Sequence, residues 1–172
     1  MLQSFFSLLY VGIVKRIKEK VPEIRWVDQD LGQLDFYEER PPVAWPCVLT
    51  DFNTTSYAPL MQQVQTGSVN INVRLAFAPF SQSSITAPGA VMDKALQFWE
   101  LEMKLYQALQ NWSPDDNICQ PLVRISAATE RREDPIRVRT LVFTTAFEDA
   151  AATRGFTKTN KPDLEEAYYK AP

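Results

Sequence analysis

The chain has 172 residues, 45% of them hydrophobic and 23% charged, with a formal net charge of −3 and an isoelectric point near 5.1. This length and balance are typical of one globular domain whose core needs no metal or disulfide, and they exclude general disorder. The charge shows no basic excess of the kind that marks a duplex-binding surface, so we expect no sequence-specific binding of nucleic acid.

The residue types that usually carry chemistry are scarce. The chain has no histidine and only two cysteines, so it lacks the ligands of a typical zinc site and the most common general base. Its five glycines form no phosphate-binding loop. Closely spaced carboxylates are the remaining candidates for acid or base work, but they fall in turns or at strand ends, where carboxylates are usually solvated. These pairs are Asp28 with Asp30, Glu38 with Glu39, Asp115 with Asp116, Glu133 with Asp134 and Glu148 with Asp149. The sequence predicts no catalytic residue, cofactor or metal.

The first predicted element is an amphipathic helix from Ser4, as its N-cap, to about Lys20. Its apolar side carries Phe6, Leu9, Ile13 and Ile17. The segment is interrupted by polar residues, is too short to span a bilayer, and has its basic residues after the apolar part, unlike a signal peptide. We therefore expect no membrane association.

Short apolar runs at residues 24–28 and 34–37 predict a hairpin with a glycine in its turn. Residues 44–52 predict an apolar strand. Because Pro41, Pro42 and Pro46 cannot donate hydrogen bonds to a neighbouring strand, we expect this strand to begin at a sheet edge. Cys47 in this run is expected in the core.

Residues 61–80 carry the longest strand pattern in the chain. Its apolar positions are Val69, Ile71, Val73, Leu75 and Phe77, which alternate with more polar residues. Fully extended, this stretch would measure on the order of 60 Å, more than the width of a domain of this size. We expect a bulge or corner at residues 66–68 or, without one, an arm that projects from the body. The flanking segments 53–60 and 81–88 predict polar loops.

A long helix is predicted over residues 88–111, about 35 Å at 1.5 Å per residue. Met92, Leu96, Trp99, Met103 and Tyr106 follow the helical period, and Ala95, Phe98, Leu105 and Leu109 widen this apolar stripe. Such a stripe is typical of a helix that lies across a sheet, and we expect Leu96, Trp99 and Met103 to be buried beneath the sheet.

Residues 121–132 and 136–148 predict a closing hairpin. The fold class expected for residues 1–149 is therefore a single α+β domain, with a mostly antiparallel sheet, an N-terminal helix and a long helix packed across the sheet. After Asp149 the composition changes, and residues 150–172 are expected to form an extended or loosely ordered tail.

The connection within this hairpin is almost entirely charged. It contains Glu130, Arg131, Arg132, Glu133, Asp134, Arg137 and Arg139 around an Asp-Pro turn. Strands of about 12 residues would carry this tip beyond the helix-covered part of the sheet. Two interpretations stay open. The charges either keep a solvated hairpin end soluble, or they form a subunit interface in which arginines pair with carboxylates of another copy.

The order of elements resembles that of the tail-terminator, or tail-completion, proteins of long-tailed phages and related injection machines. The segments that carry this likeness are residues 6–21, 40–52, 64–80, 91–112 and 123–148. The likeness is one of size and element order, and no sequence motif carries it. Residues 150–172 depart from the family pattern.

The resemblance implies a homo-oligomeric ring, usually a hexamer, that caps the finished tail tube and joins it to the neck. Its partners would be other copies of the chain, the tail-tube protein and a neck or head-closure protein. It would be located in the tail or neck of the virion, after assembly in the host cytoplasm. The family has no catalytic residues to transfer to this chain.

Other functions remain open at this point. A head-closure or neck adaptor and a tail-tube subunit have similar small folds, so the fold alone does not separate them. A small carboxylate-dependent enzyme and a monomeric binding domain with an exposed sheet are the other classes. Neighbouring genes for portal, head-closure and tail-tube proteins would favour the virion class.

Overall fold

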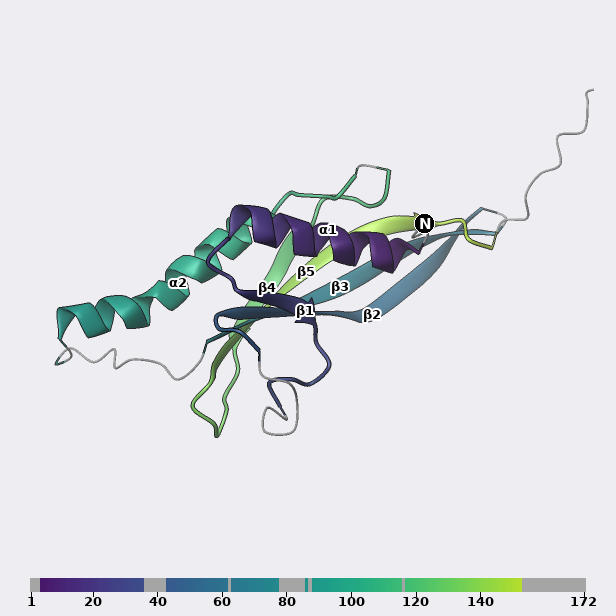
Figure 1. The fold of residues 1–172 in the computed structure, drawn as a ribbon. Helices are drawn as coiled ribbons and strands as arrows, with labels where there is room; N and C mark the ends of the chain where they lie inside the picture. The colour runs from purple at the N-terminus through teal and green to yellow at the C-terminus, as the bar shows by residue number, and fades with distance from the viewer. Residues whose placement is uncertain are drawn as a thin grey trace, which may run out of the picture.

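The computed structural model describes residues 4–35, 43–61, 63–77, 86, 88–115 and 117–152, and Figure 1 shows how their elements are arranged. Helix α1 spans Phe5–Lys20, as predicted, and buries Leu9, Ile13 and Ile17 completely. Ser4 holds the N-cap position, but its side chain makes no capping hydrogen bond, which corrects that expectation.

Five strands form one sheet in the order β1-β2-β3-β5-β4. They span Trp26–Gln29 (β1), Cys47–Met61 (β2), Val64–Phe77 (β3), Val123–Thr129 (β4) and Arg137–Asp149 (β5). Neighbouring strands are antiparallel except β1 and β2, which are parallel. The expected α+β class, the mostly antiparallel sheet and the closing β4–β5 hairpin are confirmed.

The predicted hairpin of residues 24–28 with residues 34–37 is wrong. β1 pairs instead with the beginning of β2. Leu34 lies in a turn and is fully buried in a small core cluster that includes Leu49. Its apolar side chain therefore fills space beneath the sheet and does not mark a strand. Residues 36 and 37 lie outside the described residues.

The first residues of β2 lie inside the sheet, although we expected the strand to begin at a sheet edge. β1 flanks β2 from Cys47 to Thr50, and β3 flanks it on the other side. Pro46 precedes the strand, and its carbonyl accepts a hydrogen bond from the Arg25 amide at 2.9 Å, so its missing N–H interrupts no strand pairing. Pro41 and Pro42 lie outside the described residues.

β2 and β3 form a long hairpin whose tip projects from the body as an arm (Figure 1). Residues 53–60, predicted as a loop, belong to β2 and pair with β3. The predicted corner at residues 66–68 is wrong, because β3 continues through Gly67 and the register shifts fall in β2. The alternative expectation, a projecting arm, is confirmed.

Packing against a neighbouring ring explains why position 67 is a glycine. A Cβ atom at Gly67 would lie 2.6 Å from Cε1 of Phe147, on the neighbouring strand β5. The Phe147 ring stacks on Phe5 with 3.6 Å between ring centroids. The glycine therefore provides the space in which this ring pair joins β5 to α1.

Helix α2 spans Gly89–Leu109. The side that packs into the core carries Ala95, Phe98, Leu101, Leu105, Ala108 and Leu109. The expected burial of Leu96, Trp99 and Met103 is wrong, because their side chains are 42%, 42% and 47% exposed. The apolar stripe of α2 is wider than the surface that α1 and the sheet offer, so one side of it is buried and the other is left in solvent.

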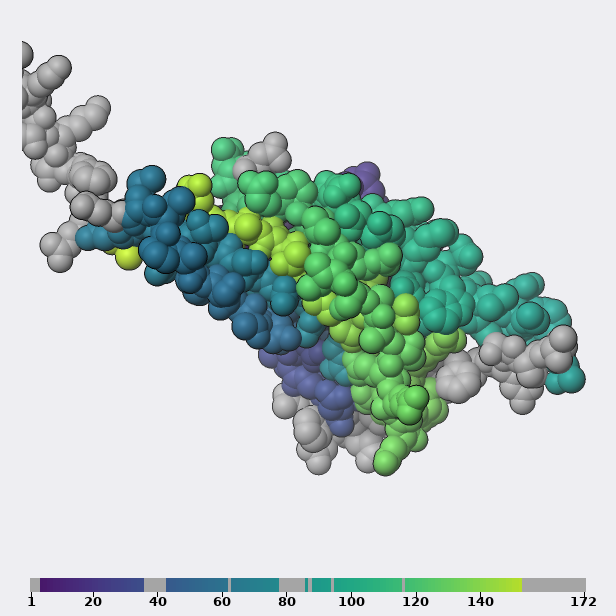
Figure 2. All heavy atoms as spheres, turned by 180° about the vertical axis from the view of Figure 1, so that it is seen from behind, coloured from purple at the N-terminus to yellow at the C-terminus, as the bar shows by residue number. Residues whose placement is uncertain are grey.

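Most of the core lies between the two helices and one face of the sheet. The smaller cluster lies on the opposite face, where Cys47 packs with Val138 and Leu34. Figure 2 shows the molecule from this opposite side, where α2 and the β2–β3 arm lie at its two ends. Cys47 and Cys119 are both buried and unpaired, which confirms Cys47 as a core residue.

Candidate subunit interface

The tip of the β4–β5 hairpin makes side-chain contacts with Leu34, Asp35 and Arg74 of the same chain. β4 ends at Thr129 and is only seven residues long, shorter than predicted. The Glu130 amide donates to the Val138 carbonyl at 3.0 Å, so the tip begins as an ordered turn. Of the predicted interface residues at this tip, Arg131 and Glu133 are exposed, whereas Glu130, Arg132 and Asp134 are partly buried.

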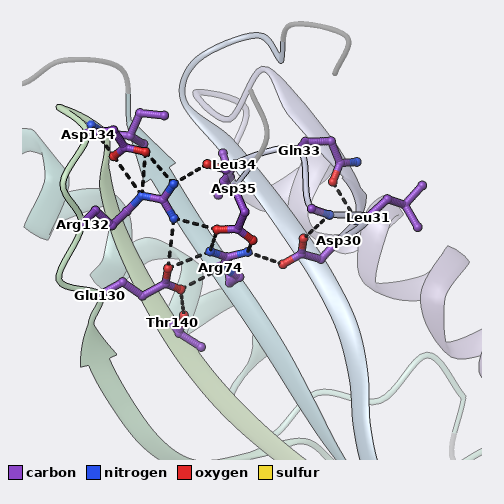
Figure 3. A network of polar contacts seen from close by, with 12 residues as sticks. Asp30, Leu31, Gln33, Leu34, Asp35, Arg74, Glu130, Arg132, Asp134 and Thr140 are labelled. Atoms are coloured by element: carbon purple, nitrogen blue, oxygen red, sulfur yellow. Dashed lines mark hydrogen bonds and ion pairs between the residues drawn. The ribbon is translucent and has the colours of Figure 1, made fainter. Parts of the chain in front are cut away.

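Arg74, on β3, is the centre of a polar network beside this tip (Figure 3). Its Nε and Nη2 atoms donate to the two carboxylate oxygens of Glu130 at 2.8 and 2.7 Å. Its Nη1 atom donates to Asp30 at 2.7 Å, and both terminal nitrogens reach Asp35 at 3.3 Å. The Arg74 side chain is only 13% exposed, so these charge-assisted bonds form largely out of water.

Arg132 makes the second half of the network. Its guanidinium donates to Asp134 at 2.6 Å, to Asp35 at 2.9 Å and to the Leu34 carbonyl. Glu130 also accepts a hydrogen bond from the Thr140 hydroxyl at 2.7 Å. Segments that are far apart in the sequence, residues 30–35 and 130–134, are thereby held together.

The network changes the acidity of its members in the direction that keeps them charged. Hydrogen bonds from Arg74 and Arg132 hold the pKa of Asp35 below its usual value. Burial alone would raise the pKa of Glu130, but hydrogen bonds from Arg74 and Thr140 lower it overall. Hydrogen bonding to Arg132 likewise lowers the pKa of Asp134.

The arginines and carboxylates of this site pair with one another within the chain. Each guanidinium has carboxylate partners within the same chain, so Arg132 would have to break these bonds to meet a carboxylate of a neighbouring copy. Among the described residues, no three or more acidic residues or cysteines form a group that could hold a metal ion. Neither described helix is long and apolar enough to cross a membrane.

Arg137 and Arg139 lie elsewhere, on β5 beside α2. The Arg137 guanidinium lies 4.1 Å from the ring centroid of Phe98 and 4.8 Å from that of Trp99. Burial, followed by the nearby charge of Arg139, lowers the pKa of Arg137. Arg139 lies 5.1 Å from the Trp99 ring and also contacts Glu102. The two arginines therefore border the exposed side of α2.

The contact of Arg139 with Glu102 is close but poorly aligned. Nε lies 2.6 Å from a carboxylate oxygen of Glu102, yet its N–H forms no hydrogen bond of acceptable geometry. We regard the pair as a charge contact, because both side chains are largely shielded from water and the distance is short. The Arg139 Nη1 atom donates instead to the Thr129 hydroxyl at 3.0 Å.

The exposed large apolar side chains of the described residues include two groups that escaped the sequence-based prediction. One is the outer side of α2, with Leu96, Trp99 and Met103, which we call the α2 patch. The other is the end of the β2–β3 hairpin, with Tyr57, Leu60 and Met61, which we call the arm patch. The width of the α2 stripe was a signal that one of its sides stays exposed. In the arm patch, Tyr57 and Leu60 lay in a segment predicted as a loop, and Met61 was the first residue of the predicted strand 61–80.

The fold is similar to that of a chain in a solved structure described as the virion of a native gene transfer agent particle. The TM-score is 0.50 at 12% sequence identity, and the match covers 86% of this chain and 100% of that chain. At this identity the similarity concerns the fold. No family model matches the chain, and the search of curated proteins also found no match.

Proposed function

We propose that this chain is a non-enzymatic structural protein of a phage or phage-like virion, and that it forms a ring at the end of the tail tube. The similarity to a chain of a gene transfer agent virion, which extends over that whole chain, is the observation that carries the assignment to a virion, and the ring at the tube end rests on the resemblance to tail-terminator proteins. The element order supports the assignment to a virion independently. In this role the partners are other copies of the chain, the tail-tube protein and a neck or head-closure protein. The resemblance to tail-terminator proteins implies a hexamer.

The interface predicted from sequence is refined by the geometry. Glu130, Arg132 and Asp134 have partners within the chain, so they support the shape of the subunit. Arg137 and Arg139 border an exposed apolar patch and are the better candidates for contact with another copy. Arg131 and Glu133 are exposed at the tip and remain candidates as well.

Deletion of the gene from its phage or particle-producing element tests the proposal. A ring that caps the tube should be needed to join finished tails to heads, so electron microscopy of the deletion should show unjoined heads and tails and tubes of irregular length. Complementation with the parent gene is the control. Loss of tubes altogether would favour a tail-tube subunit, and normal tails beside heads that have lost their DNA would favour a head-closure protein. Unchanged particles would refute a role in the virion.

A further inference from the structure

The two exposed apolar patches lie at opposite ends of the molecule. Figures 1 and 2 both place α2 at one end and the tip of the β2–β3 hairpin at the other. β5 connects the two ends, because Arg137 pairs with the last residue of β3 while Glu148 pairs with Thr66 in the arm. Arg137 and Glu148 are eleven positions apart on this extended strand, roughly 35 Å. The patches therefore cannot cover each other within one copy.

The patches differ in charge as well as in position. The α2 patch is bordered by the guanidinium groups of Arg137 and Arg139. The arm patch lies beside Glu148, which is exposed and lines a hollow of about 380 Å³ together with Leu60 and Gln120. Arg139 is already paired with Glu102, and the exposed Glu100 follows Trp99 on α2, so Arg137 is the cation that the α2 patch offers, whereas Glu148 is the carboxylate that the arm patch offers. Surfaces of this kind attract each other and repel copies of themselves.

The hollow also suits a large aromatic side chain. Trp99 is half exposed at the α2 patch, and burial of its ring would leave its indole N–H in need of an acceptor. The hollow offers polar groups of Gln120 and Glu148 beside the apolar side chain of Leu60. Tryptophan, tyrosine and arginine, which dominate the energetics of interfaces, are all present across the two patches.

We propose that copies of this chain associate head to tail, with the α2 patch of one copy seated on the arm patch of the next. The contact uses two different surfaces, so it is heterologous, and repeated contacts of this kind generate a ring if the rotation closes. The inference rests on the proposed ring function and assigns the surfaces through which the ring would form.

Cysteine cross-linking tests the pairing of the two surfaces. Leu60→Cys is made in one preparation and Met103→Cys in a second one that carries a larger tag, so that a mixed product has its own mass. Both positions are exposed, and both native thiols are buried, with the pKa of Cys47 raised to about 12 by burial. Because Cys119 lines the same hollow as Leu60, both preparations also carry Cys119→Ser. A short bismaleimide should then join the engineered thiols in preference to the buried Cys47, and the chain with Cys119→Ser alone is the control.

The mixture should give a Leu60→Cys to Met103→Cys product in at least about tenfold excess over either homodimer. A dominant Met103→Cys homodimer would indicate a symmetric contact between α2 patches and would overturn the proposal. Equal yields of all products, or no product at high protein concentration, would overturn it as well. Unchanged melting temperatures verify that both variants fold.

A reciprocal charge exchange provides the second test. Arg137→Glu and Glu148→Arg should each weaken self-association at least about tenfold, measured by analytical ultracentrifugation, because each places like charges opposite each other. The double variant restores opposite charges at every contact and should recover association. Lys15→Glu, at an exposed position of α1, is the matched control and should have no effect. A double variant no better than either single variant would overturn the pairing.

Failure of this inference is distinguishable from failure of the proposed function. The deletion experiment examines particles, and the cross-linking and charge exchange examine purified protein. Unjoined tails in the deletion, combined with a symmetric cross-link, would retain the function and remove the head-to-tail contact. Normal particles in the deletion, combined with the mixed cross-link, would remove the proposed function and retain the head-to-tail contact.

Discussion

Arg74→Met is the sharpest test of the network at the hairpin tip. Methionine keeps much of the side-chain length but removes the charge and all five donors. Breaking a buried ion pair costs about 3–5 kcal/mol, whereas an exposed pair contributes about 0–1 kcal/mol. Arg74 and Asp30 are almost buried, Glu130 is partly exposed and Asp35 is about half exposed. We therefore expect a loss of about 2–4 kcal/mol.

Urea denaturation followed by tryptophan fluorescence measures this loss, and thermal melting should show a decrease of about 5–15 °C for a chain of this size. Arg131→Met is the matched control, because Arg131 is exposed at the same tip, and it should change stability by less than about 0.5 kcal/mol. If Arg74→Met melts within a degree or two of the parent, the network does not stabilise the fold.

The same variant should alter the pH dependence of stability. The pKa values of Asp35 and Glu130 are lower in the folded chain than in the unfolded chain. Their contribution is therefore fully present above the unfolded values of about 4 and is lost as the pH falls through the folded values. Without Arg74 this loss in acid should be smaller. An identical pH profile for parent and variant would show that Arg74 is not the cause of the lowered pKa values.

The remaining predictions concern packing. Phe98→Ala should lower the free energy of unfolding by about 3–5 kcal/mol, because Phe98 is buried. Trp99→Ala should lower it clearly less, because Trp99 is half exposed. Equal losses of stability on urea denaturation would contradict the observed orientation of α2. Gly67→Ala should lower stability by about 1–3 kcal/mol by displacing the Phe147 ring, whereas a melting temperature at or above the parent's would show that the ring moves freely. Both native thiols should react with a chromogenic disulfide only after denaturation; rapid labelling of the folded chain would contradict their burial.

The elements that were predicted well are those whose signal is local. The spacing of Leu9, Ile13 and Ile17 specifies one face of α1, and the alternation of residues 69–77 specifies β3. The orientation of α2, by contrast, has no local signal in the sequence. Its apolar residues cover two adjacent sides, and only the contacts with α1 and the sheet decide which side is buried.

The polar network could not have been predicted from the sequence. Arg74 occupies an ordinary polar position in an alternating strand, and its partners lie 44 and 56 residues away at Asp30 and Glu130. The charged run at residues 130–139 was visible, but its division into a buried network and a pair of arginines beside α2 depends on the turn that follows β4. The parallel pairing of β1 with β2 likewise depends on a long connection without a local signal.

The proposed head-to-tail contact would give the exposed apolar patch on α2 a function. A monomer gains no stability from leaving Leu96, Trp99 and Met103 in solvent, and contiguous exposed apolar surface favours association. The Arg74 network meanwhile pairs Glu130, Arg132 and Asp134 of the hairpin tip within the chain, near the end of β5 where Arg137 and Arg139 lie beside α2. The two arginines already contact the Trp99 ring in the single chain. If these residues form the proposed contact, their arrangement in the single chain reduces the conformational entropy lost on association, and subunits that are already folded would assemble more readily.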